Sequence, residues 1–246
     1  MLSDVDIKKR LGINVSIHPF AREKISGCGI YVTASKLAWS LKSGKKISTG
    51  DNICIPANDA ALIITTEAIS LDKTIAGICQ SRVSLIKRGL GNNAAPITPG
   101  YTGRLLVVLN NRKNKDVSLC VGERIAIIIL HELKSEADSE GRSVADYISS
   151  GAFMGLDLIL DDQDRNELDN EMHSNGGMVK TYMEESQTYI DFTNRKNKGW
   201  LTKHIKPLLP SVIPALIGAI IGSVVTVVAT AVVTAVVTSI ATKGIN

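Results

Sequence analysis

The sequence has few of the residues that would mark a metal centre or a nucleic-acid surface. Its four cysteines are far apart and form no Cys-x-x-Cys pair: Cys28, Cys54, Cys79 and Cys120. With four scattered histidines, this spacing fits no zinc site. Aromatic residues make up 4% of the chain and the net charge is +4, so we expect no nucleic-acid partner. The first residues carry acids and no apolar run, so we expect no signal peptide there.

The C-terminal part lacks charge altogether. No charged residue or histidine occurs between Pro207 and Thr242, and a membrane span needs roughly 20 apolar residues. We therefore expect a transmembrane α-helix over residues 213–238, within an anchor of residues 207–246. The alternative is an apolar, valine-rich tail that favours β structure.

Small residues recur in this stretch at every fourth position. They are Gly218, Gly222, Thr226, Thr230, Thr234 and Thr238. Residues spaced by four share one helix face, where small side chains let two helices approach closely. The pattern therefore predicts helix association in a membrane. A pore lined by threonines and a simple low-complexity tail stay open as alternatives.

The charges that flank the stretch predict its orientation. Five basic residues lie between Arg195 and Lys206, and only Lys243 follows the stretch. The positive-inside tendency then places the N-terminal domain in the cytoplasm. We expect a single-pass protein of the inner membrane, with membrane lipid as a partner.

Residues 1–135 have the pattern of a mostly β domain. Seven short β-branched or apolar runs, separated by Gly, Pro and Asn turns, predict strands of a compact barrel or sandwich. These runs are 32–39, 52–56, 60–65, 74–79, 103–109, 117–120 and 124–130. A helix is predicted for residues 3–11, capped by Ser3 or Asp4. For the polar residues 136–206 we expect a connector with an added strand at 155–160 and a helix within 178–205.

Three stretches of this domain carry candidate ligand-binding groups. The first, Ser81 to Leu90, places an arginine, serines and a lysine on one turn that ends in glycine, which would suit an anion. The second, Ile97 to Asn111, is a Thr-Pro-Gly-Tyr turn that leads into a strand. The third, Val121 to Ala126, is a hairpin turn before the last predicted strand.

In this order and spacing, the three stretches resemble the dCTP deaminase/dUTPase superfamily over residues 1–134. The likeness extends to residues 3–7 and to Ile55-Pro56-Ala57 with the following 65–69. It implies a dUTPase-like distorted β-barrel of the β-clip type with short helices, a homotrimer or higher homo-oligomer, and nucleotide sites between subunits. The nucleotide-binding residues implied by the likeness are Arg82, Ser84, Lys87, Gly89, Thr98, Tyr101 and Gly103.

The sequence departs from the family where the family's chemistry takes place. Val83 replaces the first serine of the Arg-Ser-Ser-Leu motif, and Lys87 stands where deaminases have a second arginine. Thr98 and Val108 occupy the positions of the family's aspartate and catalytic glutamate, and Tyr31 that of an early aspartate. Deamination or phosphate hydrolysis needs a group that activates water, so we expect no catalytic residue. We also expect no cofactor or metal site, with magnesium entering only with a bound nucleotide.

These features together favour a membrane-anchored, nucleotide-binding protein that has lost its catalysis. It would sense a nucleotide, and its assembled membrane helices would disrupt the membrane, as in effectors of bacterial antiviral defence. One alternative is an active dCTP deaminase or dUTPase of deoxynucleotide metabolism. Another is a trimeric structural membrane protein, in which the β domain only brings the anchors together.

Overall fold

The computed structural model of the chain describes residues 1–138, 162–163, 166 and 183–204. The chain divides into two compact units, Met1–Thr193 and Asn194–Asn246. All the strands named below lie in the first unit. The three-part division expected from the sequence stays a prediction.

The first unit is mostly β structure, as expected. Its strands are β1 (Val15–His18), β2 (Ile25–Ser26), β3 (Gly29–Ser40), β4 (Ser48–Thr49), β5 (Asn52–Ile55), β6 (Ala60–Leu71), β7 (Ile75–Ser81), β8 (Leu90–Gly91), β9 (Ala95–Ile97), β10 (Thr102–Asn111), β11 (Val117–Cys120) and β12 (Arg124–Glu132). The helices are α1 (Asp4–Arg10), the 3-10 turn η1 (Arg22–Lys24), α2 (Val83–Lys87) and α6 (Gln187–His204). Every strand predicted from the sequence of residues 1–135 is therefore present.

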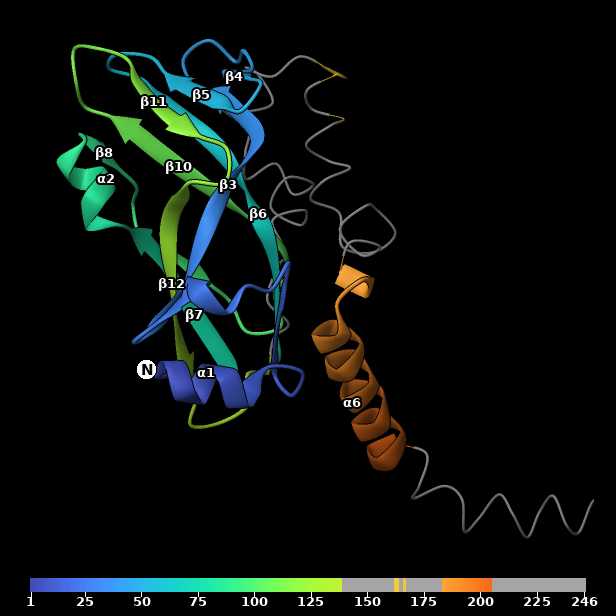
Figure 1. Ribbon diagram of the computed structural model, residues 1–246. Helices are drawn as coiled ribbons and strands as arrows, with labels where there is room; N and C mark the ends of the chain where they lie inside the picture. Colours follow the sequence, from blue (N-terminus) through green and yellow to red (C-terminus); the bar gives the residue numbers. More distant parts are fainter. Residues whose placement is uncertain (139–161, 164–165, 167–182, 205–246) are drawn as a thin grey trace, which may run out of the picture. The chain divides into compact units, whose positions relative to one another are not determined.

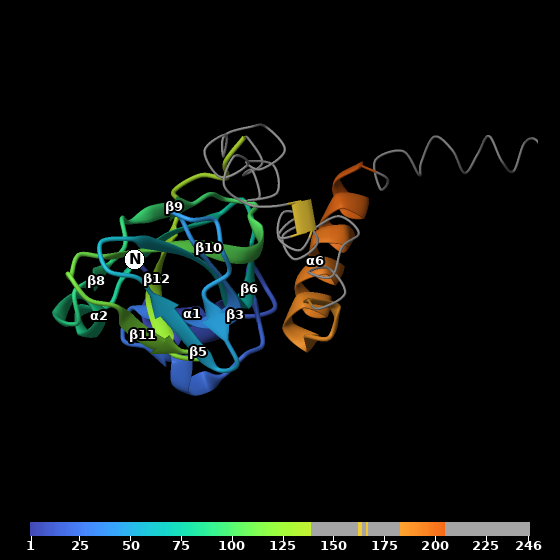
Figure 2. The ribbon, with the colours of Figure 1, turned by 90° about the horizontal axis from the view of Figure 1, so that it is seen from above.

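The strands form one large sheet and one small sheet. The large sheet has the strand order β8-β10-β6-β3-β12-β7-β9, with β1 paired to β6 and β2 paired to β3. The small sheet, β11-β5-β4, lies at one end of the domain in Figure 1, and α1 lies at the other end. α2 and β8 project from the edge of the domain in both Figure 1 and Figure 2, so the predicted basic turn is peripheral.

The three longest strands bend where their pairing shifts register. β3 shifts against β6 between Ala34 and Ala38, and β10 shifts against β6 between Arg104 and Leu106. Such bulges increase the twist of a strand, which lets a sheet curve around its own core. Alternate residues of β10 are buried along its whole length, as a sheet with one face on the core requires.

The helix α1 confirms the capping pattern seen in the sequence. Ser3 and Asp6 form a capping box: the Asp6 amide donates to the Ser3 hydroxyl at 3.2 Å, and the Ser3 amide donates to the Asp6 carboxylate at 3.1 Å. Lys8 pairs with Asp4 one turn earlier. Ile7 is completely buried and fixes the helix to the domain core.

Sequence reasoning missed α2 and five short strands, β1, β2, β4, β8 and β9. These strands have two to four residues, too few to show an alternating pattern. Pairing within the sheet, and not local propensity, determines such strands. α2 has five residues, of which only Leu85 is buried, so no helical period can be seen there.

The predicted transmembrane α-helix is wrong for the part of the chain that the structure describes. No helix among those residues is both long and apolar enough to cross a membrane. α6 has 18 residues, but charges interrupt it at Asp191, Arg195, Lys196 and Lys198. Such a helix would bring several charged side chains into hydrocarbon, which is costly.

Several expectations concern residues that lie outside the described ones. These are the anchor at 207–246, the strand at 155–160 and the small residues expected to associate, which are Gly218, Gly222, Thr226, Thr230, Thr234 and Thr238. The helix expected within 178–205 is present as α6 and begins at Gln187.

The cysteines allow a direct check of the domain core. Burial raises the pKa of the Cys79 thiol to about 12, whereas Cys120 is exposed. Because the thiolate is the reactive form, we expect iodoacetamide at pH 8 to modify Cys120 first and Cys79 last. Peptide mass spectrometry of the folded chain measures both rates, and denaturation in guanidinium should bring them together. Equal rates in the folded chain would contradict this core.

Candidate functional site

The basic turn predicted from the sequence is the junction of β7 and α2. Arg82 is the N-cap residue of α2, and Ser84 and Lys87 on the helix are exposed. Gly89 ends the turn with a φ of +87°, a conformation that favours glycine. The structure therefore brings these four candidate anion-binding residues together at one peripheral turn.

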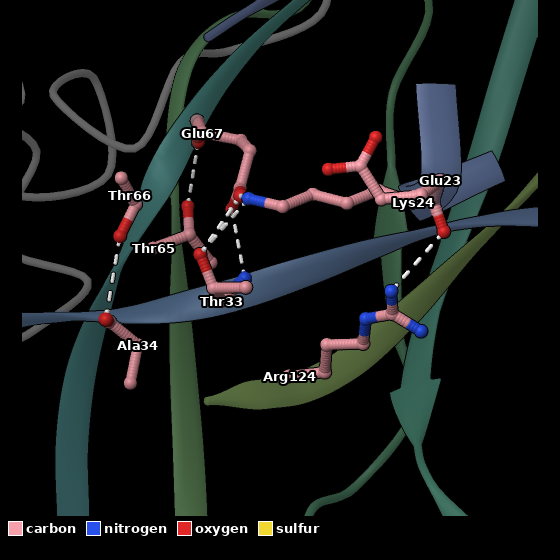
Figure 3. Close-up of polar contacts among 8 residues, drawn as sticks. All are labelled: Glu23, Lys24, Thr33, Ala34, Thr65, Thr66, Glu67 and Arg124. Atoms are coloured by element: carbon pink, nitrogen blue, oxygen red, sulfur yellow. Dashed lines mark hydrogen bonds and ion pairs between the residues drawn. The ribbon is translucent and has the colours of Figure 1, made fainter. Parts of the chain in front are cut away.

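Two arginines at this turn stack on one aromatic ring. The guanidinium carbons of Arg82 and Arg124 each lie 5.0 Å from the centre of the Tyr31 ring. Arg82 also donates to the Arg124 carbonyl at 2.8 Å, and Arg124 donates to the Glu23 carbonyl at 3.1 Å (Figure 3). No carboxylate among the described residues pairs with either guanidinium. The two guanidinium groups therefore make cation–π contacts with the Tyr31 ring and no ion pair with a carboxylate in the part of the chain that the structure describes.

The remaining predicted residues lie at the turn between β9 and β10. The Tyr101 amide donates to the Thr98 carbonyl at 3.2 Å, and the Gly100 amide donates to the Asp72 carbonyl at 3.2 Å. The Tyr101 side chain is buried, and its hydroxyl donates to the Arg104 carbonyl. Burial raises the pKa of Tyr101 well above its ordinary value. Tyr101 therefore supports this turn from inside and does not present its ring to a ligand.

Gly103 completes the same turn. Its φ is +154°, and a Cβ at this position would lie 3.3 Å from the Tyr101 hydroxyl oxygen. A side chain there would press on the buried ring, so glycine is explained by packing within the domain. Thr98 is half-buried, and its neighbour Pro99 leads directly into the turn.

One protomer does not bring the two groups of predicted residues together. β9 pairs with β7 so that Ile97 lies opposite Gly77, which places Thr98 beside the start of β7. Arg82 follows the last residue of β7. Six residues of strand separate the two places, which is roughly 20 Å. The two groups of predicted residues therefore lie apart within one copy of the chain.

A pocket of about 400 Å³ opens beside α2 and β8. Gly89 is the only predicted site residue that lines it. The polar side chains of its wall are Gln80, Ser81, Asn92, Asn93, Asn110 and Arg112. Ser81 and Asn92 bond to each other, and the Asn110 side chain donates to the Gly91 carbonyl at 3.3 Å. Gln80, Asn93 and Arg112 have no side-chain partner within the described residues, so their polar groups are available to a ligand.

The rim of the pocket is positively charged. The Arg112 amide donates to the Gly89 carbonyl at 3.1 Å, which fixes the loop after β10 against the end of α2. Lys113 runs alongside Gly89, where a Cβ would lie 2.7 Å from its side chain. Arg88 differs because it is paired with Glu123. The sequence signal for this rim is the run Asn-Arg-Lys-Asn-Lys at residues 111–115, which motif reasoning missed.

Val108, which the family likeness places at the position of a catalytic glutamate, has apolar packing neighbours. Val108 is half-buried on β10 and packs with Leu106 against a cluster of Leu37, Trp39, Leu62 and Ile64. No group of metal-binding side chains occurs in the described part of the chain. Val108 itself therefore supplies no carboxylate that could activate water.

The domain does contain one fully buried carboxylate, on Glu67 of β6. It accepts hydrogen bonds from the Thr33 amide at 2.7 Å and the Thr33 hydroxyl at 2.8 Å, and it pairs with Lys24 (Figure 3). Its side chain has no exposed surface. With all its partners inside the domain, Glu67 cannot reach a ligand, and its role is structural.

Comparisons with known proteins agree with the motifs. The family model described as dCTP deaminase-like matches residues 1–133. The dCTP deaminase of Thermococcus gammatolerans is 31% identical over 137 residues, which are 56% of this chain and 85% of the relative. The dCTP deaminase of Pyrococcus horikoshii is 31% identical over 136 residues, 54% of this chain and 83% of the relative. The family likeness is thus confirmed, and the loss of catalysis stays a prediction.

Solved structures of the same kind also resemble the chain. The 2'-deoxycytidine 5'-triphosphate deaminase from Agrobacterium tumefaciens superposes with a TM-score of 0.47 and 12% identity, over 53% of this chain and 47% of that one. The EIAV dUTPase superposes with a TM-score of 0.38 and 20% identity, over 52% of this chain and 96% of that one.

The buried carboxylate should carry much of the domain's stability. Glu67→Ala would leave Lys24 and two Thr33 donors without their acceptor, so we expect the free energy of unfolding to fall by about 3–5 kcal/mol. Urea denaturation of the full chain measures this change. Glu23→Ala, at an exposed acid beside Lys24, is the control, and we expect it to cost less than about 0.5 kcal/mol. Equal losses would contradict the structural role of Glu67.

Proposed function

We propose that this chain, which belongs to the dCTP deaminase-like family, binds a nucleotide through residues 1–133 and does not convert it. The observation that carries the proposal is the charge of the β7–α2 turn and the adjacent pocket. Arg82, Arg124 and Lys87 have no carboxylate partner among the described residues, and Arg112 lies on the pocket wall. Guanidinium and ammonium groups bind phosphate oxygens well.

The pocket beside the turn suits a ligand that has polar groups, such as a base or sugar, as well as phosphate groups. Gln80 and Asn93 each offer a donor and an acceptor, which is what the edge of a nucleobase or the hydroxyls of a sugar need. Its volume of about 400 Å³ lies in the range of small-molecule sites. The charged β7–α2 turn and the side-chain amides of Gln80 and Asn93 are therefore two parts of one proposed site.

The proposed site is completed by a second copy of the chain. Thr98 and Arg82 lie at opposite ends of β7, so a homo-oligomer, for which we propose a trimer, would place one copy's β9–β10 turn near another copy's α2 turn. In that arrangement Thr98 and the backbone around Gly103 would contact the ligand from the second copy. Magnesium would come with the nucleotide and not from side chains of the chain.

An active deaminase is the second candidate, and the named relatives favour it. Chains called dCTP deaminase share about 30% identity with this one. The surroundings of Val108 oppose it, since general acid–base catalysis needs a titratable group within hydrogen-bond reach of the reacting atom. The expected antiviral role and the expected location in the inner membrane are untested and stay predictions.

Calorimetric titration of the full chain with dCTP and dUTP tests the proposal. We expect micromolar binding that Arg82→Glu weakens by at least about tenfold, because the substitution reverses a charge at the proposed phosphate position. Lys9→Ala, on α1 at an exposed position, is the control and should bind like wild type. Light scattering on the same samples gives the number of copies. Binding that is absent, or that Arg82→Glu leaves unchanged, would refute the proposed site.

The Tyr31 ring should contribute to binding by positioning both arginines. Tyr31→Leu removes the ring face on which they stack, so we expect dCTP affinity to fall by about 3- to 10-fold. Tyr31→Phe keeps the ring and should bind nearly as well as wild type. Calorimetry compares the two variants, and similar affinities for both would show that stacking on the ring has no part in binding.

A further inference from the structure

A part of the large sheet's outer face, on β1 and β6, is buried although it points away from the core. Residues directly opposite each other in antiparallel strands share a face, and Ser16 of β1 lies opposite Ser70 of β6 as His18 lies opposite Ala68. The intervening residues, such as Ile17 and Ile69, belong to the main apolar core. Ser16, Ala68 and Ser70 are nevertheless completely buried. Some other segment of the chain must therefore cover this outer face.

Residues Met183–Phe192, here called the strap, supply contacts to that face. Met183 is completely buried and packs against Ala68. The Thr188 hydroxyl lies 3.0 Å from the Ser16 hydroxyl, and Glu185 lies 3.6 Å from His18. A sheet face of small and polar residues thus meets a segment with one buried methionine and several hydrogen-bonding groups.

The strap has its own internal support. Its Ser186 and Thr188 hydroxyls lie 2.9 Å apart, and the Gln187 side chain donates to Asp191 at 2.9 Å. Phe192 is buried and its ring stacks with that of Tyr189, with 6.4 Å between the ring centres. These contacts order the strap as a unit, so it can seat on the sheet or leave it as a whole.

The covered face extends to the β9–β10 turn. Thr102 lies opposite Ser70, and the Ser70 hydroxyl donates to the Thr102 hydroxyl at 3.0 Å. Thr102 is the first residue of β10 and directly follows Tyr101 in the turn. A row of hydroxyl groups runs from the strap across β1 and β6 to the turn. Its members are Thr188, Ser16, Ser70 and Thr102.

We infer that the strap is an intramolecular element seated on the outer face of β1 and β6, and that its seating depends on the conformation of the β9–β10 turn. The Ser70–Thr102 contact joins the start of β10 to β6, and β6 pairs with β1, the strand that carries Ser16. If a ligand at the turn changes how stably the strap is seated, the seated strap changes the affinity for that ligand by the same factor. A ligand that binds at the turn, such as the proposed nucleotide, would therefore change how stably the strap is seated. The inference does not require that ligand.

Thiol labelling of the full chain tests the seating. The thiol introduced by Ser16→Cys lies under the strap, whereas native Cys120 is exposed and serves as an internal standard. We expect the new thiol to react at least about tenfold more slowly than Cys120 at the same pH. Adding Met183→Asp should bring its rate close to that of Cys120, because a charge cannot remain in the buried methionine position. Ile190→Asp, at an exposed strap position, is the matched control and should leave the rate low.

The dependence on the turn is tested in the same background. Thr102→Val removes the hydroxyl that Ser70 contacts, and we expect the thiol at position 16 to react about three- to tenfold faster. Thr49→Val, at an exposed threonine of β4, is the control and should change nothing. A slow rate that Met183→Asp does not raise would refute the seating. A rate that Thr102→Val leaves unchanged would refute the link to the turn, whether or not the chain binds a nucleotide.

Discussion

The buried carboxylate of Glu67 is the contact on which the arrangement of this domain depends. It joins β6 to β3 through Thr33 and to η1 through Lys24. Its neighbour Thr65 accepts from the Leu105 amide at 2.9 Å, beside the register shifts that bend β3 and β10. Leaving a buried charge unpaired is costly. The contacts of Glu67 and Thr65 therefore fix how β3, β6 and β10 pair beside one another.

The position of the charged turn depends on the same pairing of strands. Arg124 pairs with Thr33 in the sheet, and Tyr31 lies two residues before Thr33, so the Glu67 contact also sets the place of the stacked arginines. The result is a peripheral turn with positive charge, a polar pocket beside it, and an apolar environment at Val108. Binding an anion needs the first two features.

The sequence predicted those features that depend on near neighbours. A cap at Ser3 or Asp4 predicted α1, and the apolar run of residues 103–109 predicted β10. It could not show that Lys24 meets Glu67 across 43 residues, or that Tyr101 turns inward, because these contacts depend on the folded sheet. The motif order identified the family and implied sites between subunits, and within one copy of the chain Arg82 and Thr98 lie apart along β7. The apolar composition suggested a membrane helix, and the described helices provide none.

We propose that the site holds a nucleotide and leaves it intact. The most direct measurement of this claim incubates the concentrated full chain with an equal amount of dCTP and magnesium, separates bound from free nucleotide by filtration, and identifies both by chromatography. We predict that a substantial share of the dCTP is retained with the protein and is recovered unchanged. Recovery as deaminated or dephosphorylated nucleotide, or no retention at all, would contradict the claim.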